Sequence, residues 1–228
     1  MPSRHAVLPL ATALALGGCS GDLSTLAPAG PAAASTALLW WVMFGGATLI
    51  FAGVMGLVGL AFLRPGIGAA IPPRLWLVWG GLVFPGAVLA ALLVFALATG
   101  ERLLARPGSG AYTVEAVPRQ WHWTFRYPGG RQTVDQLHLP AGRPVDVRVT
   151  GTDVIHSFWV PRLGGKIDAI PGHVNTIRLQ ADAPGRFGGT CAEFCGLGHS
   201  TMTFTVLAHD AAGFEAALAA AATVEAPP

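Results

Sequence analysis

The sequence is short of charged residues. Lys and Arg contribute 14 of its 228 residues and Asp and Glu contribute 12, so charged side chains make up 11% of the chain. An average soluble domain carries about 25%. Hydrophobic residues make up 52%, which excludes an intrinsically disordered chain and argues against a wholly soluble one. The net charge of +2 is too small to indicate a nucleic-acid partner.

Several common motifs are also missing. The sequence has no internal repeat, no phosphate-binding loop and no Gly-x-Ser-x-Gly nucleophile motif. Its 30 Gly follow no period, so a collagen-like chain is excluded. Cys is rare, with three residues in the chain, and any chemistry that needs Cys must use those three positions.

The charge deficit is concentrated in two segments. Ala37–Leu63 and Leu75–Gly100 contain no charged residue, and each is longer than the roughly 20 residues that a helix needs to cross a bilayer. They predict a transmembrane helix hairpin over residues 37–100, with Pro85 disturbing the second helix locally. The connector Arg64–Arg74 carries two Arg and no acid, which places it in the cytoplasm and both flanks outside.

The N-terminus resembles an export signal. Arg4 precedes an apolar run that ends in Leu-Gly-Gly-Cys19, as in bacterial lipoprotein signals, where the Cys is lipidated after cleavage. We therefore expect a lipoprotein-type signal peptide over residues 1–18, a lipidated Cys19 and a flexible tether over residues 19–36. An ordinary signal peptide with an incidental Cys is the alternative, and both readings export the N-terminus.

From Ala111 onward the pattern changes to alternating apolar and polar residues between Gly and Pro turns. This pattern predicts an all-β sandwich or barrel over residues 107–209. The clearest strands are Tyr112–Val117, Val145–Val149, Val174–Leu179 and Thr201–Val206. Residues 210–228 predict a C-terminal helix and tail, with Asp210 as the N-cap and with Phe214 and Leu218 docked on the β domain.

Four candidate metal donors lie within twelve residues, at Cys191, Cys195, His199 and Met202. Two Cys in an exported domain usually form a disulfide, but a disulfide does not require the His and the Met. Structural zinc prefers four Cys or His donors, and Met is a poor zinc ligand. Two thiolates, an imidazole and a thioether are soft donors, so the set favours copper.

The number of Cys residues indicates two metal ions. A single blue-copper site uses one Cys, two His and a weak axial ligand, which leaves one Cys too many. Two bridging sulfurs and four further donors would complete two four-coordinate sites. His199 and Met202 supply two of those donors, and His156 is the best candidate for a second imidazole. A main-chain carbonyl could be the last.

These residues resemble the CuA motif of cytochrome c oxidase subunit II. The resemblance extends over most of the chain beyond the leader, including the helix hairpin. Its segments are Gln120–Trp123, His156–Pro161, Gly165–Gly172 and Cys191–Met202. It implies a membrane-anchored all-β protein, with a two-helix transmembrane hairpin followed by a cupredoxin-like Greek-key β-barrel.

The resemblance also implies residue roles. Cys191 and Cys195 would bridge two coppers, His156 and Met202 would complete one of them, and His199 with the Glu193 carbonyl would complete the other. The Glu193 side chain would reach a Mg site shared with the large subunit, with Asp168 supporting that site from the second shell. Trp121 would be the residue at which electrons enter.

The implied function is that of subunit II of an oxidase in the bacterial inner membrane. It would accept electrons from cytochrome c and pass them to the haem-bearing subunit I, where oxygen reduction is coupled to proton translocation. The copper domain would lie on the periplasmic face, with the lipid bilayer and oxidase subunits as partners and no nucleic acid. The chain would not be catalytically complete alone, because neither apolar segment contains His as a haem ligand.

The sequence departs from the pattern of this family at two places, and two other functions are alternatives. Many relatives carry a carboxylate near the start of the second helix, whereas Arg74 is the only charge between Ile71 and Phe84 here. Three Arg residues flank Trp121 in sequence, where many relatives present acids to a basic cytochrome c. The alternatives are a quinol oxidase subunit II, which lacks the copper ligands, and a membrane-anchored copper-delivery lipoprotein, which usually has a thioredoxin-like fold.

Overall fold

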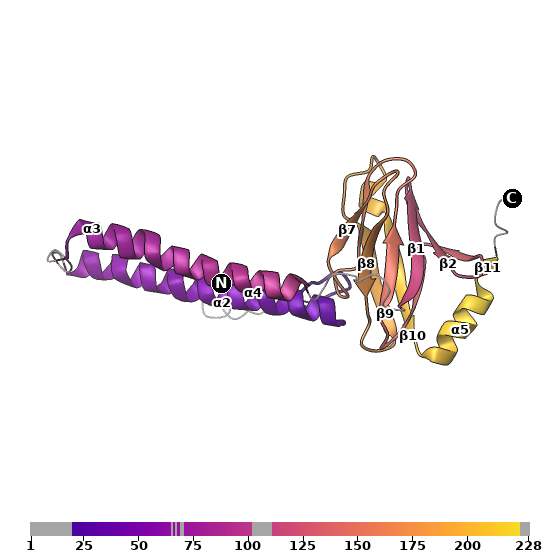
Figure 1. The fold of residues 1–228 in the computed structure, drawn as a ribbon, viewed down its shortest axis with the longest axis horizontal. Helices are drawn as coiled ribbons and strands as arrows, with labels where there is room; N and C mark the ends of the chain where they lie inside the picture. The colour runs from indigo at the N-terminus through magenta and orange to yellow at the C-terminus, as the bar shows by residue number, and fades with distance from the viewer. Residues whose placement is uncertain (1–19, 65, 67, 69–70, 102–110, 224–228) are drawn as a thin grey trace, which may run out of the picture. The chain divides into compact units, whose positions relative to one another are not determined.

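The computed structural model of the protein describes residues 20–223, except 65, 67, 69–70 and 102–110 (Figure 1). These residues form two compact units. One unit contains the helices from Leu38 onward, and the other combines residues 20–37 with the β domain that follows Ala111. The expected signal peptide (1–18), the lipidation site Cys19 and the end of the C-terminal tail lie outside the described residues.

Two helices in the described part of the chain are long and apolar enough to cross a membrane. The first is α2 (Pro31–Leu63), and the second is built from α3 (Pro73–Leu75), η2 (Trp76–Val83) and α4 (Phe84–Glu101). The most apolar window of each has 0% of its residues buried. A helix without a polar face needs an apolar environment, and a lipid bilayer supplies one.

The second helix changes its hydrogen-bond pattern just before Pro85. The segment η2 is a π-helix, in which the Phe84 N–H donates to the Trp79 carbonyl oxygen, and α geometry resumes at Phe84. Pro has no N–H, and its ring clashes with a carbonyl of the preceding turn in a regular α-helix. A widened turn at this place relieves such a clash.

The β domain consists of two sheets. The first has the order β11-β3-β2-β1-β5-β8 and the second β4-β10-β9-β6-β7. The strands of the first sheet are β1 (Tyr112–Arg119), β2 (His122–Tyr127), β3 (Arg131–Val134), β5 (Val145–Val149), β8 (Asn175–Leu179) and β11 (Ala222–Thr223). Those of the second are β4 (Gln136–Pro140), β6 (His156–Trp159), β7 (Lys166–Ala169), β9 (Gly185–Cys191) and β10 (Thr203–His209).

The strand connections confirm the expected fold class of a two-helix anchor followed by a cupredoxin-like Greek-key β domain. The chain crosses from one sheet to the other between β3 and β4, and again before β5, β6, β8, β9 and β11. Two of the pairings are parallel, β1 with β5 and β10 with β4, and the other pairs of neighbouring strands are antiparallel. Crossing connections of this kind place strands that are distant in sequence side by side.

The inner faces of both sheets meet in one core. Its centre is a cluster of four buried rings, Trp123, Phe125, Phe158 and Phe204, whose neighbouring centroids lie 5.0–6.4 Å apart. Aromatic side chains bury large areas, so such a cluster contributes strongly to stability. The same cluster reaches the candidate site, because the Trp123 ring lies 6.3 Å from the His156 ring.

The segment before α2 differs from the expected flexible tether over residues 19–36. The Ala29 N–H donates to the Arg162 carbonyl oxygen at 2.7 Å, and the Asp182 N–H donates to the Ala29 carbonyl oxygen at 2.9 Å. Small residues were expected to leave the segment loose, but here they permit close backbone packing. A Cβ on Gly30 would lie 2.0 Å from the Gln180 carbonyl oxygen, and Ala33 is buried.

The C-terminal helix α5 (Ala211–Ala220) follows an N-cap at Asp210, whose side chain accepts a hydrogen bond from the Gly213 N–H. Just before it, His209 shares a 2.8 Å hydrogen bond with the buried His138. Burial, and to a smaller extent the proximity of His209, lowers the pKa of His138. The folded protein therefore disfavours the imidazolium form of His138.

We expect Phe158→Ala to lower the free energy of unfolding by about 3–5 kcal/mol, because the change opens a cavity among the four core rings. Denaturant unfolding in detergent, followed by near-UV circular dichroism, measures the effect. Phe194→Ala is the matched control, since Phe194 is 75% exposed. Equal destabilisation by the two variants would show that the aromatic cluster does not hold the sheets together.

A second prediction concerns pH. Below the unfolded pKa of about 6.5, the unfolded chain takes up a proton at His138 that the folded protein disfavours. The stability of the wild type should therefore fall as the pH decreases from 7 to 5.5. His138→Gln should reduce this slope by at most about 1.4 kcal/mol per pH unit. His173→Gln, at an exposed histidine, is the control, and an unchanged slope in His138→Gln would contradict the assignment.

Candidate metal centre

The candidate centre forms where β9 ends between two neighbouring strands. Cys191 is the last residue of β9, and it is the register partner of Phe158 in β6. Its N–H donates to the Met202 carbonyl oxygen at 2.9 Å, and the Ala192 N–H donates to the Ser157 carbonyl oxygen at 2.9 Å. These bonds close the loop from Cys191 to Met202 and fix it beside His156 at the start of β6.

The loop is tightly wound between its ends. Gly196 has φ +118°, in the region that favours glycine, and the 3-10 turn η3 (His199–Thr201) follows. The His199 N–H donates to the Gly196 carbonyl oxygen, and the Met202 N–H donates to the His199 carbonyl oxygen. This winding returns His199 and Met202 toward the two cysteines.

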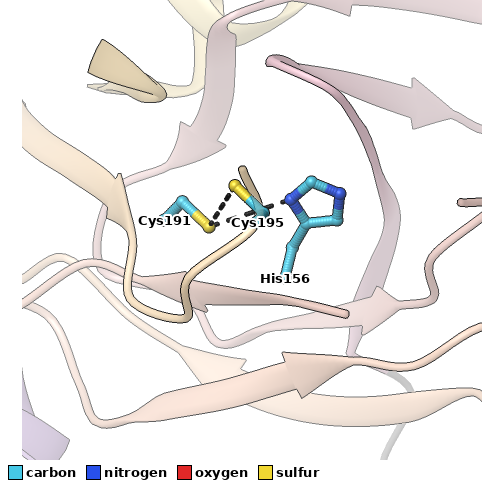
Figure 2. Close-up of side chains that lie close together, drawn as sticks. All are labelled: His156, Cys191 and Cys195. Atoms are coloured by element: carbon cyan, nitrogen blue, oxygen red, sulfur yellow. Dashed lines mark hydrogen bonds between the residues drawn. The ribbon is translucent and has the colours of Figure 1, made fainter. Parts of the chain in front are cut away.

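All six expected donors lie next to a cysteine sulfur. The Sγ atoms of Cys191 and Cys195 are 3.8 Å apart, and His156 Nδ1 is 3.8 Å from the Cys191 sulfur (Figure 2). The Cys195 sulfur lies 3.7 Å from His199 Nδ1 and 3.6 Å from Met202 Sδ. The Glu193 carbonyl oxygen lies 3.2 Å from the Cys191 sulfur.

The donors are withdrawn from solvent. His156 and Met202 are 0% exposed and each cysteine is 3% exposed. Burial raises the pKa of the Cys195 thiol to about 12, and the neighbouring Cys191 contributes in the same direction. Thiolates in this position need a cation beside them, which a metal ion provides.

The set of donors fits copper. It combines two thiols, two imidazoles, one thioether and one carbonyl oxygen, and soft sulfur with imidazole nitrogen is the combination that copper prefers. His156, Cys191 and Cys195 form a group of metal donors whose ligand atoms lie within 4.8 Å of one another. A structural zinc site would not use the thioether of Met202.

Asp153 orients the His156 imidazole, a contact that was not predicted from the sequence. Its Oδ1 lies 2.9 Å from His156 Nε2, and its Oδ2 accepts a 2.8 Å hydrogen bond from the Gln120 N–H. Burial alone would raise the pKa of Asp153, but these hydrogen bonds outweigh burial and lower it. The three-residue interval from Asp153 to His156 was a visible signal for this role.

The residues expected at a magnesium site are not brought together in this way. Glu193 is exposed, and Asp168 in β7 is half-buried, with its carbonyl oxygen accepting a hydrogen bond from Asn175. Among the described residues, neither carboxylate joins the group formed by His156, Cys191 and Cys195. A magnesium site at Glu193 would therefore need donors from another subunit.

Trp121 lies over the loop from Cys191 to Met202. A Cβ on Gly198 would be 2.4 Å from Trp121 Cδ2, so the indole rests directly on the loop backbone. The side of the indole away from the loop is open, and Trp121 is 42% exposed. The loop adds two further exposed apolar side chains, Phe194 at 75% and Leu197 at 97%.

A separate cavity of about 430 Å³ borders the site at Cys191 and His199. The segment before α2 and the first turns of α2 contribute Thr25, Ala33 and Thr36 to its wall. Lys166 supplies a positive charge. The residues expected to form a tether thus form part of the surroundings of the candidate centre.

Fold and donors together define a cupredoxin-like domain with a candidate soft-metal site, preceded by two apolar helices. A family model described as "Cytochrome C oxidase subunit II, periplasmic domain" matches residues 130–209. The cytochrome c oxidase subunit 2 of Alkalihalophilus pseudofirmus is 42% identical over 102 residues, which cover 44% of this chain and 30% of that protein. This chain therefore spans less than a third of that relative's length.

Another relative matches over more of the chain. The quinol oxidase subunit 2 of Bacillus cereus is 31% identical over 227 residues, covering 88% of this chain and 73% of the relative. Among solved structures, the periplasmic domain of subunit II of cytochrome oxidase of Bradyrhizobium japonicum is 31% identical, with a TM-score of 0.47. That match covers 48% of this chain and 92% of that one. The chain belongs to the cytochrome c oxidase subunit II family.

Proposed function

We propose that this chain is the copper-binding subunit II of a cytochrome c oxidase. It accepts electrons from cytochrome c at a binuclear CuA centre and passes them to the haem-bearing subunit I. The observation that carries the proposal is the convergence of six soft or carbonyl donors on two cysteine sulfurs. The donors are His156, Cys191, the Glu193 carbonyl, Cys195, His199 and Met202.

In this proposal Cys191 and Cys195 would be shared by the two coppers. His156 and Met202 would complete one site, and His199 with the Glu193 carbonyl would complete the other. Bound copper would supply one-electron redox chemistry. The chain contributes a buried and hydrogen-bonded frame that holds the donors close together, so a change of oxidation state requires little movement of the protein.

Electrons enter through Trp121, and docking of the donor is mainly apolar. Trp121 is exposed and rests on the loop that carries three of the side-chain donors after Cys191. Three Arg residues flank Trp121 in the sequence, at Arg119, Arg126 and Arg131. These positive charges disfavour a strongly basic partner, so apolar contacts would carry most of the docking.

The remaining parts of the proposal concern the whole oxidase. The two apolar helices anchor the chain in the bacterial inner membrane, with the β domain on the periplasmic face and a lipidated Cys19. The Glu193 carboxylate takes part in a magnesium site shared with subunit I, supported by Asp168. The protons used in oxygen reduction enter by a path that does not begin at the start of the second helix, since Arg74 is the only charge between Ile71 and Phe84.

A quinol oxidase subunit II is the second candidate. The observation in its favour is the Bacillus cereus relative, which covers 88% of this chain. Such a subunit would need no copper donors, whereas this chain keeps the complete set next to the two cysteine sulfurs. Copper content distinguishes the two functions.

We expect the full-length chain, purified in detergent and loaded with copper, to bind two coppers and turn purple. Its EPR spectrum should show a mixed-valence centre, with one unpaired electron shared by both ions. Met202→Leu should alter this spectrum while leaving the unfolding midpoint almost unchanged, because Leu fills a similar volume without a sulfur donor.

Met55→Leu, on the exposed surface of α2, is the control for the same chemical change. A single-copper signal would refute the binuclear assignment. A protein that folds but retains no copper would favour the quinol oxidase function.

We also expect electron transfer from a basic cytochrome c to depend weakly on ionic strength. Two acids of the β domain lie beside bases: Asp146 pairs with Arg178 at 2.7 Å, and Glu115 faces Arg148 at 3.5 Å. Salt screens steering by exposed charges but leaves apolar contacts in place. Stopped-flow reduction of the copper-loaded chain at increasing salt measures this, and a steep fall in rate would mean that an acidic face guides docking.

A further inference from the structure

The turn between β1 and β2 is hydrogen-bonded to both of the segments that carry the metal donors. Gln120 Nε2 donates to the Cys195 carbonyl oxygen at 2.7 Å. The Gln120 N–H donates to Asp153 Oδ2 at 2.8 Å, and Asp153 Oδ1 lies 2.9 Å from His156 Nε2. One residue outside the donor set thus joins the Cys195 loop, the His156 strand and its own neighbour Trp121.

The turn itself has few other restraints. Arg119 and His122 are the last pair of the β1–β2 ladder, so Gln120 and Trp121 extend beyond the paired strands. Both residues are exposed. The Trp121 indole covers Gly198 and approaches Gly196, where an added Cβ would be 3.3 Å from Trp121 Cζ2. The same Cβ would lie 2.9 Å from Gln120 Nε2, so amide and indole occupy one narrow space above the loop.

We propose that Gln120 is a positioning residue, which holds the Trp121 indole against the loop Cys191–Met202 and ties that loop to His156 through Asp153. The hydrogen bonds of Gln120 to the Cys195 carbonyl and to Asp153 do not require a metal. Its consequence for electron transfer rests on the proposed function, because it requires Trp121 to be the residue at which electrons enter.

Two features explain why this restraint by Gln120, called the clamp below, is needed. An exposed indole on a two-residue turn can rotate or lift away from its support, and each added ångström between donor and acceptor slows electron transfer. The loop also carries its donors on a tightly wound backbone, and a bond to the Cys195 carbonyl restrains the residue that would bridge both ions. Residues that orient metal ligands in this way typically change affinity or activity 10–100-fold when replaced.

The test uses Gln120→Met in the full-length chain, because Met keeps the length of the side chain and removes the amide donor. Gln136→Met, at an exposed position of β4, is the matched control. The chain is labelled with 5-fluorotryptophan, and the Trp121 resonance is assigned with Trp121→Phe. The first readout is the ¹⁹F NMR spectrum of the metal-free protein.

We expect the Trp121 resonance to move toward the position of a solvated indole, or to broaden, in Gln120→Met and to stay in place in Gln136→Met. The other Trp resonances should not change in either variant. An unchanged Trp121 resonance in Gln120→Met would overturn the clamp. If every Trp resonance moved, the variant would be disturbing the fold, and a positioning role would be wrong.

The second readout uses the copper-loaded chains. At a saturating concentration of a c-type cytochrome, Gln120→Met should be reduced at least tenfold more slowly than the wild type, whereas ascorbate should reduce both to completion. An unchanged rate from the cytochrome would overturn the link to electron transfer. If the ¹⁹F signal moves but the wild type holds no binuclear copper, the proposed function fails while the clamp stands.

Discussion

The pairing of Cys191 with Met202 is the constraint on which the site depends. One backbone hydrogen bond, from the Cys191 N–H to the Met202 carbonyl oxygen, closes a loop that begins at the end of β9 and ends just before the adjacent β10. Because the ends are fixed by the β9–β10 ladder, the loop must turn back on itself, and its side chains converge. The Ala192 N–H then bonds to Ser157, which sets the distance to His156 in β6. Donors that are separated in sequence are thus held by the register of three neighbouring strands.

The same constraint explains the electrostatic character of the site. The loop carries its cysteines into a nearly solvent-free region, where burial raises the pKa of Cys195 to about 12. A buried pair of thiolates would be unstable without a compensating cation. Within the described residues, Asp153 is the carboxylate that contacts the donor set, where its Oδ1 lies 2.9 Å from His156 Nε2. If both thiols are deprotonated, a metal ion is the cation that this donor set fits, with Asp153 supporting the His156 imidazole.

Much of this arrangement could be predicted from sequence because it is local. The spacing from Cys191 to Met202 brings four donor types into one loop, and alternation in Val145–Val149 matches β5 residue for residue. The contacts of Gln120 could not be predicted, since they join residues 33 and 75 positions away and depend on the register of both sheets. The prediction of a flexible tether over residues 19–36 differs from the structure for a related reason. Their small side chains are typical of a loose linker, but the same smallness lets Gly30 and Ala33 pack closely once a partner surface exists.

The long match to a quinol oxidase subunit and the complete donor set are compatible. The match reflects the fold of the whole chain, whereas the donor set is a feature of one site on that fold. Helix hydrophobicity, strand alternation and the β core are requirements of a membrane-anchored β domain, and one such frame can carry different functions. The quinol oxidase subunit 2 of Bacillus cereus matches 88% of this chain at 31% identity. The metal chemistry depends on a few side chains added to this frame. His156 and Met202 are fully buried and could each be replaced by an apolar residue of similar size without loss of the core. Their position next to two cysteines is therefore a property of the site and not of the fold, and it is the reason to propose the copper-dependent function for this chain.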